Sequence, residues 1–592
     1  MITSLTYPFD ISIILRKKKA IKRELLLKSP QTAINVAILG GSTTDEMKNI
    51  LELFLLNNGF LPNFYQSEYN KFYEDAVFDN EELSLFKPDI ILIHTSVVNI
   101  TEYPRFSDNS EDVDQLLRIE LRKFKTIWQS LAKYNCAIIQ NNFDLPLNRS
   151  LGSLDCYDIH GKTFFISKLN LEFSNSAGEI KNLYINDINY LSASIGIKNW
   201  FDRNLWHSAK YAISFDSMPL YAHQVASIVK AIVGGPKKCL VLDLDNTCWG
   251  GIIGDDGLDG ICLGNETAQG ESFMYFQNYV KELKERGVIL AVCSKNEHDL
   301  AKEGFLHPDS VLKFEDFTSF QANWEPKSEN IKKIADQINI GLDSLVFIDD
   351  NSVEREIVSS QLPVVSVPDA GSDVMNFVDH IEKNAYFEIV SLSNDDVNRN
   401  KFYQDNNARL EQESLFRSYD EFLISLGMVA EIKPFSSLYI DRITQLINKT
   451  NQFNLTTKRY VIGEIEAISG DENYIKLYGK LTDKFGDNGL ITILIGQIID
   501  QACHLDLWLM SCRVLKRNME FALLDRLVEE CQKRGVTEII GYYYRTPKNN
   551  MVAGFYKTMG FELVSTEGEN SVWKLMVNSY KIKNNLIKID NE

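Results

Sequence analysis

The stretch Val241-Leu242-Asp243-Leu244-Asp245-Asn246-Thr247 decides the fold of the central part of this chain. It closes an apolar run that begins at Cys239, and it places two carboxylates two residues apart just after that run. Such a run is typical of a buried strand in a parallel sheet, and ligands bind where these strands end. We therefore expect Asp243 and Asp245 at the ligand-binding edge of a sheet.

Three further polar elements follow in order. Ser294 comes directly after an apolar run, Lys327 lies in Trp-Glu-Pro-Lys, and the pair Asp349-Asp350 follows another apolar run. Carboxylates ligate hard cations such as Mg²⁺, whereas a hydroxyl and an ammonium group hold phosphate oxygens. One Asp-x-Asp alone is typical of an exposed turn. The four elements together indicate phosphoryl transfer with an aspartate nucleophile.

Apolar runs alternate with helical patterns along much of the chain, which predicts an α/β multidomain protein. We expect an α/β domain over 1–234, a parallel-sheet domain over 235–390 with strands as far as Val364–Val367, and an α+β domain with a helical linker over 391–592. Gly234-Gly235-Pro236 is the predicted linker after the first domain.

Composition excludes several classes of protein. The chain has 592 residues and a formal net charge of −19, which disfavours binding to nucleic acid or to anionic membranes. Its nine cysteines form no CxxC pair, so we expect reduced thiols and no structural zinc. No apolar run approaches the roughly 20 residues that span a bilayer. These features predict a soluble cytoplasmic protein.

The four polar elements resemble those of phosphatases of the haloacid dehalogenase (HAD) superfamily. The resemblance implies that Asp243 attacks phosphorus and that Asp245 is the general acid and base. The implied ligands of the phosphoryl group are Thr247, Ser294 and Lys327, and those of Mg²⁺ are Asp243, Asp349, Asp350 and the carbonyl oxygen of Asp245.

Longer motifs resemble the FkbH-like family, in which a HAD phosphatase domain of subfamily IIIC is fused to a GNAT-like acyltransferase domain. They are Asp243–Gly257, Phe347–Glu356, Lys449–Thr456, Phe485–Gly489 and Ser511–Val514, and the resemblance covers roughly residues 236 to 580. Members in polyketide clusters take 1,3-bisphosphoglycerate, remove its phosphates and deliver a glyceryl unit to the thiol of an acyl carrier protein. Others act in polysaccharide or amino-sugar pathways.

This resemblance implies Mg²⁺ as cofactor and an acyl carrier protein as partner. One alternative is a plain phosphomonoesterase, or a polysaccharide or amino-sugar pathway enzyme, whose acyltransferase domain only binds. Another is a non-enzymatic scaffold, which the intact set of polar residues disfavours.

Two cysteines are candidate acyl acceptors. Cys248 follows Thr247, and its thiol is able to form a thioester with a neighbouring acyl phosphate, although free cysteines are commonly small buried hydrophobes. Cys512 adjoins the segment 513–518, where GNAT enzymes carry a glycine-rich loop that binds the pyrophosphate of coenzyme A. Lys516 and Asn518 replace its glycines, so we expect Arg513 and its neighbouring cations to meet the single phosphate of a phosphopantetheine arm.

The first domain resembles the SGNH hydrolases, which have a flavodoxin-like fold, because Gly40-Gly41-Ser42 follows a predicted strand like their nucleophile loop. That family also needs an aspartate and a histidine near the end of the domain. Here Asp216-Ser-Met-Pro219 carries proline where the histidine is expected. Without a base Ser42 is a weak nucleophile, so we expect a non-catalytic domain.

Overall fold

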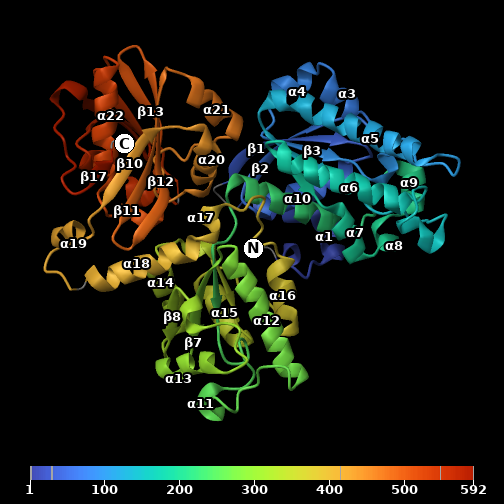
Figure 1. Cartoon of the computed structure of the whole chain (residues 1–592), viewed down its shortest axis with the longest axis horizontal. Coiled ribbons are helices and arrows are strands. Elements are labelled where there is room, and N and C mark those ends of the chain that lie inside the picture. The colour runs from blue at the N-terminus through green and yellow to red at the C-terminus, as the bar shows by residue number, and fades with distance from the viewer. Residues whose placement is uncertain (1–2, 28–30, 414, 547, 591–592) are drawn as a thin grey trace. The chain divides into compact units, whose positions relative to one another are not determined.

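A computed structural model describes residues 3–27, 31–413, 415–546 and 548–590 (Figure 1). The chain forms two compact units, one of Met1–Ile232 with Val461–Glu464 and the other of Val233–Tyr460 with Ile465–Glu592. Among the described residues, no helix is both long enough and apolar enough to cross a membrane.

The first unit contains a five-stranded parallel sheet in the order β2-β1-β3-β4-β5. Its strands are β1 (Thr32–Gly40), β2 (Phe60–Gln66), β3 (Ile90–His94), β4 (Ala137–Asn141) and β5 (Leu183–Asn186). Its helices are α1 (Ile11–Leu26), α2 (Asp45–Asn57), α3 (Phe72–Val77), α4 (Glu81–Phe86), α5 (Ser110–Leu131), α6 (Lys162–Glu179), α7 (Ile188–Ile195), α8 (Ile197–Trp200), α9 (Arg203–Ala209) and α10 (Met218–Val233). The strand order is that of flavodoxin-like folds, as the resemblance to SGNH hydrolases implies.

The second unit contains two sheets. The first is a four-stranded parallel sheet in the order β8-β7-β6-β9, built from β6 (Cys239–Leu242), β7 (Ile289–Ser294), β8 (Ser319–Ala322) and β9 (Leu345–Ile348). The helices of this region are α11 (Ile253–Asp256), α12 (Ala268–Glu285), α13 (His298–Glu303), α14 (Lys327–Gln337), α15 (Ser352–Gln361) and α16 (Met375–Glu382). Its parallel strands confirm the predicted fold class.

Alternating side chains of β6 fix this layered arrangement. Leu240 and Leu242 pack in a buried cluster with side chains of α12 and α16, whereas Cys239 and Val241 pack in a cluster with side chains of α14 and α15. Successive side chains of a strand point to opposite faces, so a strand apolar at every position needs helices on both faces. Asp243 is the first residue beyond this buried strand.

One predicted strand is wrong. The segment Val364–Val367 does not form a strand, and only Ser366 makes an isolated bridge, to Val346. Val364 is exposed and follows Pro363, which has no N–H to donate to a strand ladder. The fourth strand is instead β8, a short segment of mixed polarity whose burial comes from β7 and α14.

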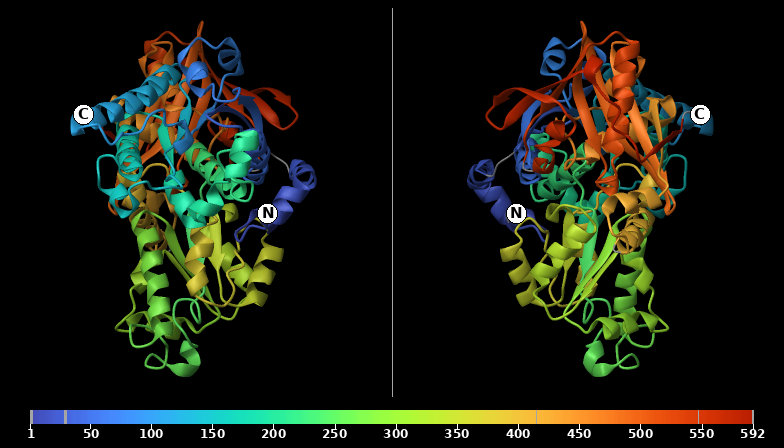
Figure 2. Two further views of the ribbon diagram at one scale, coloured as in Figure 1. Left: turned by 90° about the vertical axis from the view of Figure 1, so that its right-hand side faces the viewer. Right: turned by 90° about the vertical axis from the view of Figure 1, so that its left-hand side faces the viewer.

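The other sheet of this unit has eight strands in the order β15-β16-β14-β13-β12-β11-β10-β17. They are β10 (Val429–Pro434), β11 (Tyr474–Asp483), β12 (Gly486–Ile499), β13 (Ala502–Met510), β14 (Glu538–Tyr543), β15 (Glu562–Glu567), β16 (Asn570–Met576) and β17 (Lys588–Asp590). The helices are α17 (Asn394–Val397), α18 (Arg399–Glu413), α19 (Tyr419–Ser425), α20 (Ile440–Lys449), α21 (Ile462–Gly470), α22 (Met519–Lys533) and α23 (Phe555–Thr558). The mixed sheet with its packed helices confirms the predicted α+β architecture, and the hairpin of β15 and β16 extends at its edge (Figure 2).

The parallel strands β13 and β14 are paired along only part of their length. They pair from Ala502 opposite Glu538 to Leu505 opposite Gly541. Beyond Leu505, β13 still pairs with β12, but its other side pairs with the segment 453–455, where Asn454 bridges Leu509. This segment fills the gap between the two strands, because Leu455 donates to Trp508 of β13 and accepts from Tyr544, which follows β14.

Candidate active site

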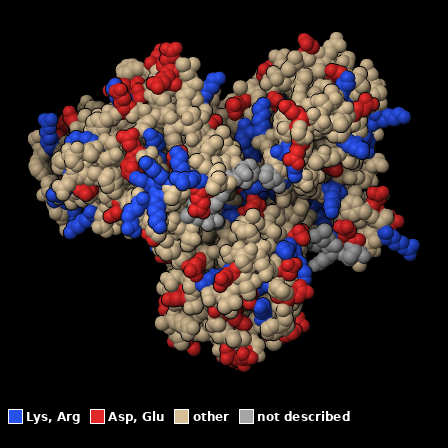
Figure 3. Space-filling model, turned by 180° about the vertical axis from the view of Figure 1, so that it is seen from behind, with Lys and Arg blue, Asp and Glu red and all other residues tan. Residues whose placement is uncertain are grey.

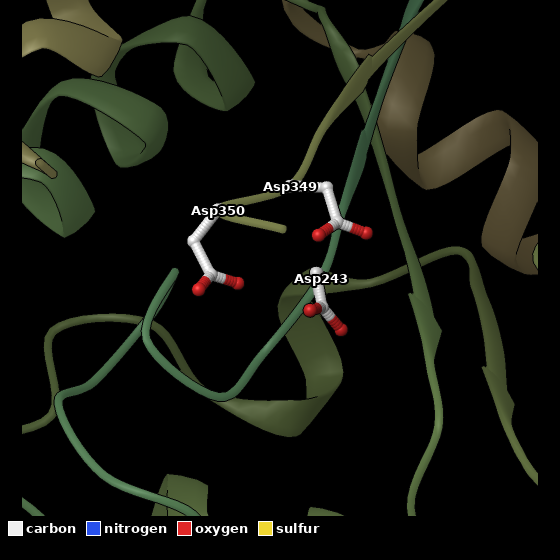
Figure 4. Close-up of side chains that lie close together, drawn as sticks. All are labelled: Asp243, Asp349 and Asp350. Atoms are coloured by element: carbon white, nitrogen blue, oxygen red, sulfur yellow. The ribbon is translucent and has the colours of Figure 1, made fainter. Parts of the chain in front are cut away.

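Three carboxylates form a cluster at the carboxyl edge of the central sheet (Figure 4). Asp243 follows β6, and Asp349 and Asp350 follow β9, which is the neighbouring strand. The backbone N–H of Asp243 donates to the carbonyl oxygen of Ile348 at 3.0 Å, which fixes the two strand ends side by side. One carboxylate oxygen from each aspartate lies within 4.8 Å of the others.

Lys327, at the start of α14, supplies positive charge to this cluster. Its Nζ lies 3.0 Å from an oxygen of Asp243 and 2.5 Å from an oxygen of Asp349. Burial alone lowers the pKa of Lys327, but the two aspartates more than offset it, so the ammonium stays charged. One ammonium leaves three carboxylates with excess negative charge. Their oxygens at this spacing suit a hard divalent cation such as Mg²⁺.

Asp245 is held by hydrogen bonds on both of its oxygens. One oxygen accepts from the indole N–H of Trp249 at 2.9 Å and from the backbone N–H of Ile253 at 3.1 Å, and the other accepts from the Asn296 amide at 2.8 Å. Burial raises the pKa of Asp245, although these hydrogen bonds oppose it. A fixed carboxyl group with a raised pKa suits proton transfer to a leaving group.

The two predicted phosphate-binding hydroxyls are buried at the same edge. Ser294 ends β7, and Thr247 lies in the turn after β6. The Thr247 hydroxyl has no hydrogen-bond partner among the described residues. Because buried hydroxyls are nearly always hydrogen-bonded, this group is a candidate donor to a ligand. The structure therefore brings all the predicted HAD residues to one sheet edge.

Three residues without a predicted role complete the site. Trp249 and Asn296 fix Asp245, and Arg355 donates to the backbone oxygens of both Asp349 and Asp350. Arg355 also donates to the carbonyl oxygen of Gly371 and to the carboxylate of Asp369. It therefore links the loop that carries Asp349 and Asp350 to the loop at residues 369–371. Trp249 and Arg355 lie inside the motifs quoted above. Asn296, only two residues after Ser294, had no such signal.

Cys248 lies beside Asp243 but is completely buried. Its Sγ donates to the backbone oxygen of Asp243 at 3.3 Å. Burial, together with the negative charges of Asp243 and Asp245, raises the pKa of this thiol well above its ordinary value. Proximity favours Cys248 as an acyl acceptor, whereas burial and charge oppose formation of its thiolate.

Cys512 and Arg513 lie at the other edge of the central sheet. Asn339, in the segment that precedes β9, donates to the backbone oxygen of Cys512 at 2.9 Å. The Arg513 guanidinium is buried over the ring of Phe402, 4.6 Å from its centroid. The structure therefore does not bring Cys512 or Arg513 to the carboxylate cluster, which lies at the opposite end of β9.

The segment 513–518 is occupied by contacts within the protein. The Arg517 guanidinium is buried, donates to the Asp483 carboxylate and also contacts Asn406 of helix α18. Tyr419 donates to the backbone oxygen of Lys516 at 2.8 Å. The Arg517 cation and the Lys516 carbonyl thus have protein partners in this conformation.

Ser42 in the first unit is buried, and its hydroxyl has no hydrogen-bond partner among the described residues. His94, whose backbone oxygen accepts from Gly41, directs its ring to the Tyr221 hydroxyl at 2.8 Å. Burial lowers the pKa of His94 to about 4, which keeps it neutral. In the part of the chain that the structure describes, no base is hydrogen-bonded to Ser42, so a non-catalytic first domain stays our prediction.

Comparison with known proteins finds one family model and several solved structures that are similar to this chain. Residues 35–230 match the family model of the FkbH N-terminal domain. The crystal structure of the N-terminal part of BF1531 from Bacteroides fragilis, which contains a phosphatase domain complexed with Mg, is 31% identical, with a TM-score of 0.59. That match covers 63% of this chain and 99% of the other.

A second solved structure is the ribosomal-protein-S18-alanine N-acetyltransferase from Escherichia coli, at 15% identity and a TM-score of 0.20. That match covers 25% of this chain and 94% of the acetyltransferase chain. No curated protein matches the chain.

Proposed function

Because this chain belongs to the FkbH-like family, we propose that it is a Mg²⁺-dependent phosphatase that couples phosphate removal to the transfer of a small acyl group onto a carrier-protein thiol. The phosphatase domain is the part that carries the catalytic chemistry. The observation that supports this function most strongly is the cluster of Asp243, Asp349 and Asp350 with Lys327, beside a separately anchored Asp245.

In the proposed reaction Asp243 attacks the phosphorus of the substrate's phosphate ester and leaves its acyl phosphate intact, and Lys327 with the hydroxyls of Thr247 and Ser294 holds the phosphoryl oxygens. Asp245 gives its proton to the leaving oxygen and later removes a proton from the water that hydrolyses the aspartyl-phosphate. Bound Mg²⁺, held by Asp243, Asp349 and Asp350, supplies charge neutralisation for the phosphate. Arg355 donates to the backbone oxygens of Asp349 and Asp350 and so keeps these two residues in place.

The proposed acyl donor is a small acyl phosphate, of which 1,3-bisphosphoglycerate is the family's example, and the product is a glyceryl thioester on an acyl carrier protein. Two routes to it are open. In one, the Cys248 thiolate attacks the acyl carbon, the C–O bond to the acyl phosphate breaks and inorganic phosphate leaves, which requires the buried thiol to become accessible. In the other, the carrier's own thiol attacks the acyl group directly.

The decisive experiment incubates the purified chain with Mg²⁺, 1,3-bisphosphoglycerate and a holo carrier protein, and then measures phosphate release and the intact masses of both proteins. A carrier mass increased by a glyceryl unit supports the proposal. Phosphate release without carrier acylation would leave a plain phosphomonoesterase, or an enzyme of a polysaccharide or amino-sugar pathway, with an acyltransferase-like domain that only binds. Absence of both would contradict the assignment.

A further inference from the structure

A cavity of about 330 Å³ lies in the second unit, at the end of the central sheet opposite the carboxylate cluster. Its walls come from the segments that precede β6, β7 and β9, from helices α17, α18 and α20, and from the loop after β13. Lys238 and Asp243 flank β6 and are five residues apart, so roughly 16 Å of strand separates the cavity from the phosphoryl site. The cavity is therefore a separate site.

The charge of the cavity is opposite to that of the chain. Eight basic and three acidic side chains line it, a formal charge of +5, in a protein whose net charge is −19. The basic residues are Lys237, Lys238, Arg286, Arg399, Arg442, Lys449, Arg513 and Lys548, and the acidic ones are Asp343, Asp395 and Asp396. On the face drawn in Figure 3, acidic and basic side chains both reach the surface, and several basic ones gather in one patch. The cavity thus concentrates positive charge.

Two of the three carboxylates of the cavity, Asp395 and Asp396, are each shared between two cations. Asp395 lies 3.0 Å from the guanidinium of Arg442 and 4.0 Å from that of Arg513. The Nε of Arg442 is buried and has no hydrogen-bond partner among the described residues. A buried guanidinium N–H without an acceptor is costly, so this donor is available for an anion.

Asp396 is shared in the same way, between Arg399 and Lys449. Burial lowers the pKa of Lys449, and the positive charge of Arg399 lowers it further. Burial also lowers the pKa of Lys238, for which no ion pair is found among the described residues. Buried like charges repel one another, and a bound anion would relieve that repulsion.

We propose that this cavity binds a small molecule that carries two or more phosphate groups. A surplus of five positive charges exceeds what one phosphate neutralises, and the volume lies within the range of small-ligand sites. Guanidinium groups such as those of Arg442 and Arg513 bind phosphate oxygens through paired N–H donors. Such groups occur in free bisphosphorylated metabolites and in the pyrophosphate esters of cofactors. This proposal does not depend on the phosphatase reaction.

Cys512 provides a reporter for occupancy, because its half-buried thiol lines the cavity. The full chain is alkylated with iodoacetamide in excess chelator, and labelling of Cys512 and of the exposed Cys156 is followed by peptide mass. We expect inorganic pyrophosphate to slow labelling of Cys512 at least fivefold, without an effect on Cys156. Inorganic phosphate at the same concentration should protect much less.

Two further probes identify the source of the phosphates. Protection by desulfo-coenzyme A, which has no thiol of its own, would indicate a cofactor ester, whereas protection by fructose 1,6-bisphosphate alone would indicate a free metabolite. Either result supports the site. Unchanged labelling of Cys512 with every probe, or equal protection by inorganic phosphate, would overturn the proposal.

Substitutions of basic residues that line the cavity test which side chains bind pyrophosphate. We expect Arg442→Gln and Lys449→Gln each to weaken pyrophosphate binding, measured by calorimetry, at least tenfold. Lys533→Gln is the matched control, because Lys533 is an exposed side chain of α22 outside the cavity. If both cavity variants bind as tightly as the control, the proposal is wrong. If a variant does not fold, protection of Cys512 in the unchanged chain still decides the question.

Discussion

Asp243 occupies the position where the phosphoryl group would be attacked, 3.0 Å from the ammonium of Lys327. We predict that Asp243→Asn lowers phosphate release by about 10³-fold or more, because an amide neither attacks phosphorus nor ligates Mg²⁺ as a carboxylate does. Initial rates of phosphate release measure the effect. Asp379→Asn, at an exposed side chain of α16, is the control and should keep full activity. Substantial turnover by the Asp243 variant would exclude an aspartyl-phosphate.

Asn296 is a positioning residue, because its amide donates to the carboxylate of Asp245 at 2.8 Å. That hydrogen bond lowers the pKa of Asp245, so we predict that Asn296→Ala raises it further and moves the corresponding limb of the pH–rate profile to higher pH. We also expect kcat to fall about tenfold as Asp245 loses its anchor. Asn278→Ala, on the exposed face of α12, should change neither quantity. A lower kcat with an unmoved profile would indicate a structural role only.

The sequence predicted some of these residues and not others, for a physical reason. Asp243, Ser294 and Asp349 each follow an apolar strand, and parallel strands bring their carboxyl ends to one edge. Their proximity therefore follows from local pattern and topology. Asn296 and Arg355 act through contacts between loops whose paths depend on packing across the whole domain.

At the scale of elements, the ends of β6 and β9 form one cation site from two strands. We predict that a chelator stops phosphate release and that Mg²⁺ restores it, whereas Zn²⁺ restores it poorly because all the ligands are oxygens. Activity titrations in chelated buffer with each added metal measure this. Asp350→Asn should raise the Mg²⁺ concentration needed for half-maximal activity. Full activity in excess chelator would rule out the metal site.

The loop after β4 carries a pH-sensitive contact in the first unit. Asp144 is buried, and its carboxylate accepts from the N–H of Val97 at 2.8 Å and from the indole of Trp200 at 2.9 Å. Burial raises its pKa to about 6, despite these hydrogen bonds. The folded-state pKa exceeds the unfolded one, so this carboxyl stabilises the fold fully below pH about 4, and the contribution is lost as pH rises through about 6.

We predict that the stability of the unit falls by about 3 kcal/mol across this window through Asp144 alone. Asp144→Asn, which cannot ionise, should lose this pH dependence while losing one hydrogen bond at every pH. Urea unfolding of the full chain, followed by tryptophan fluorescence between pH 4 and pH 7, tests it. Asp216→Asn, at an exposed position, should retain the dependence. An unchanged slope in the Asp144 variant would contradict the sign of the shift.

Elements were predicted best where the apolar pattern was strong. The strands β6, β7 and β9 follow from runs in which every residue is apolar, whereas β8 contains Ser319 and Gln321 and gave no comparable signal. Helix α18 was expected as a polar helical linker, but its contacts with the loop after β13 were not. A helix pattern shows which residues lie on one face and does not show which distant loop that face covers.

At the scale of the whole molecule, the two candidate acyl acceptors lie at opposite edges of one sheet. Cys248 contacts the backbone of Asp243, whereas Cys512 contacts Asn339 in the segment before β9. Of these two candidates, only Cys248 therefore lies next to the site where Asp243 would react in this conformation. Transfer through Cys512 would require the acyl group to travel about the length of a strand.

We therefore predict that Cys248→Ser lowers the rate of carrier acylation more than Cys512→Ser does, while phosphate release continues in both. Serine nearly preserves the volume of cysteine but forms an ester that exchanges poorly with a thiol, so packing is hardly disturbed while transfer is blocked. Intact masses of enzyme and carrier, taken over time with 1,3-bisphosphoglycerate, follow both events. If both variants load the carrier at the unmodified rate, no enzyme thioester is required, and the carrier thiol attacks the acyl group directly.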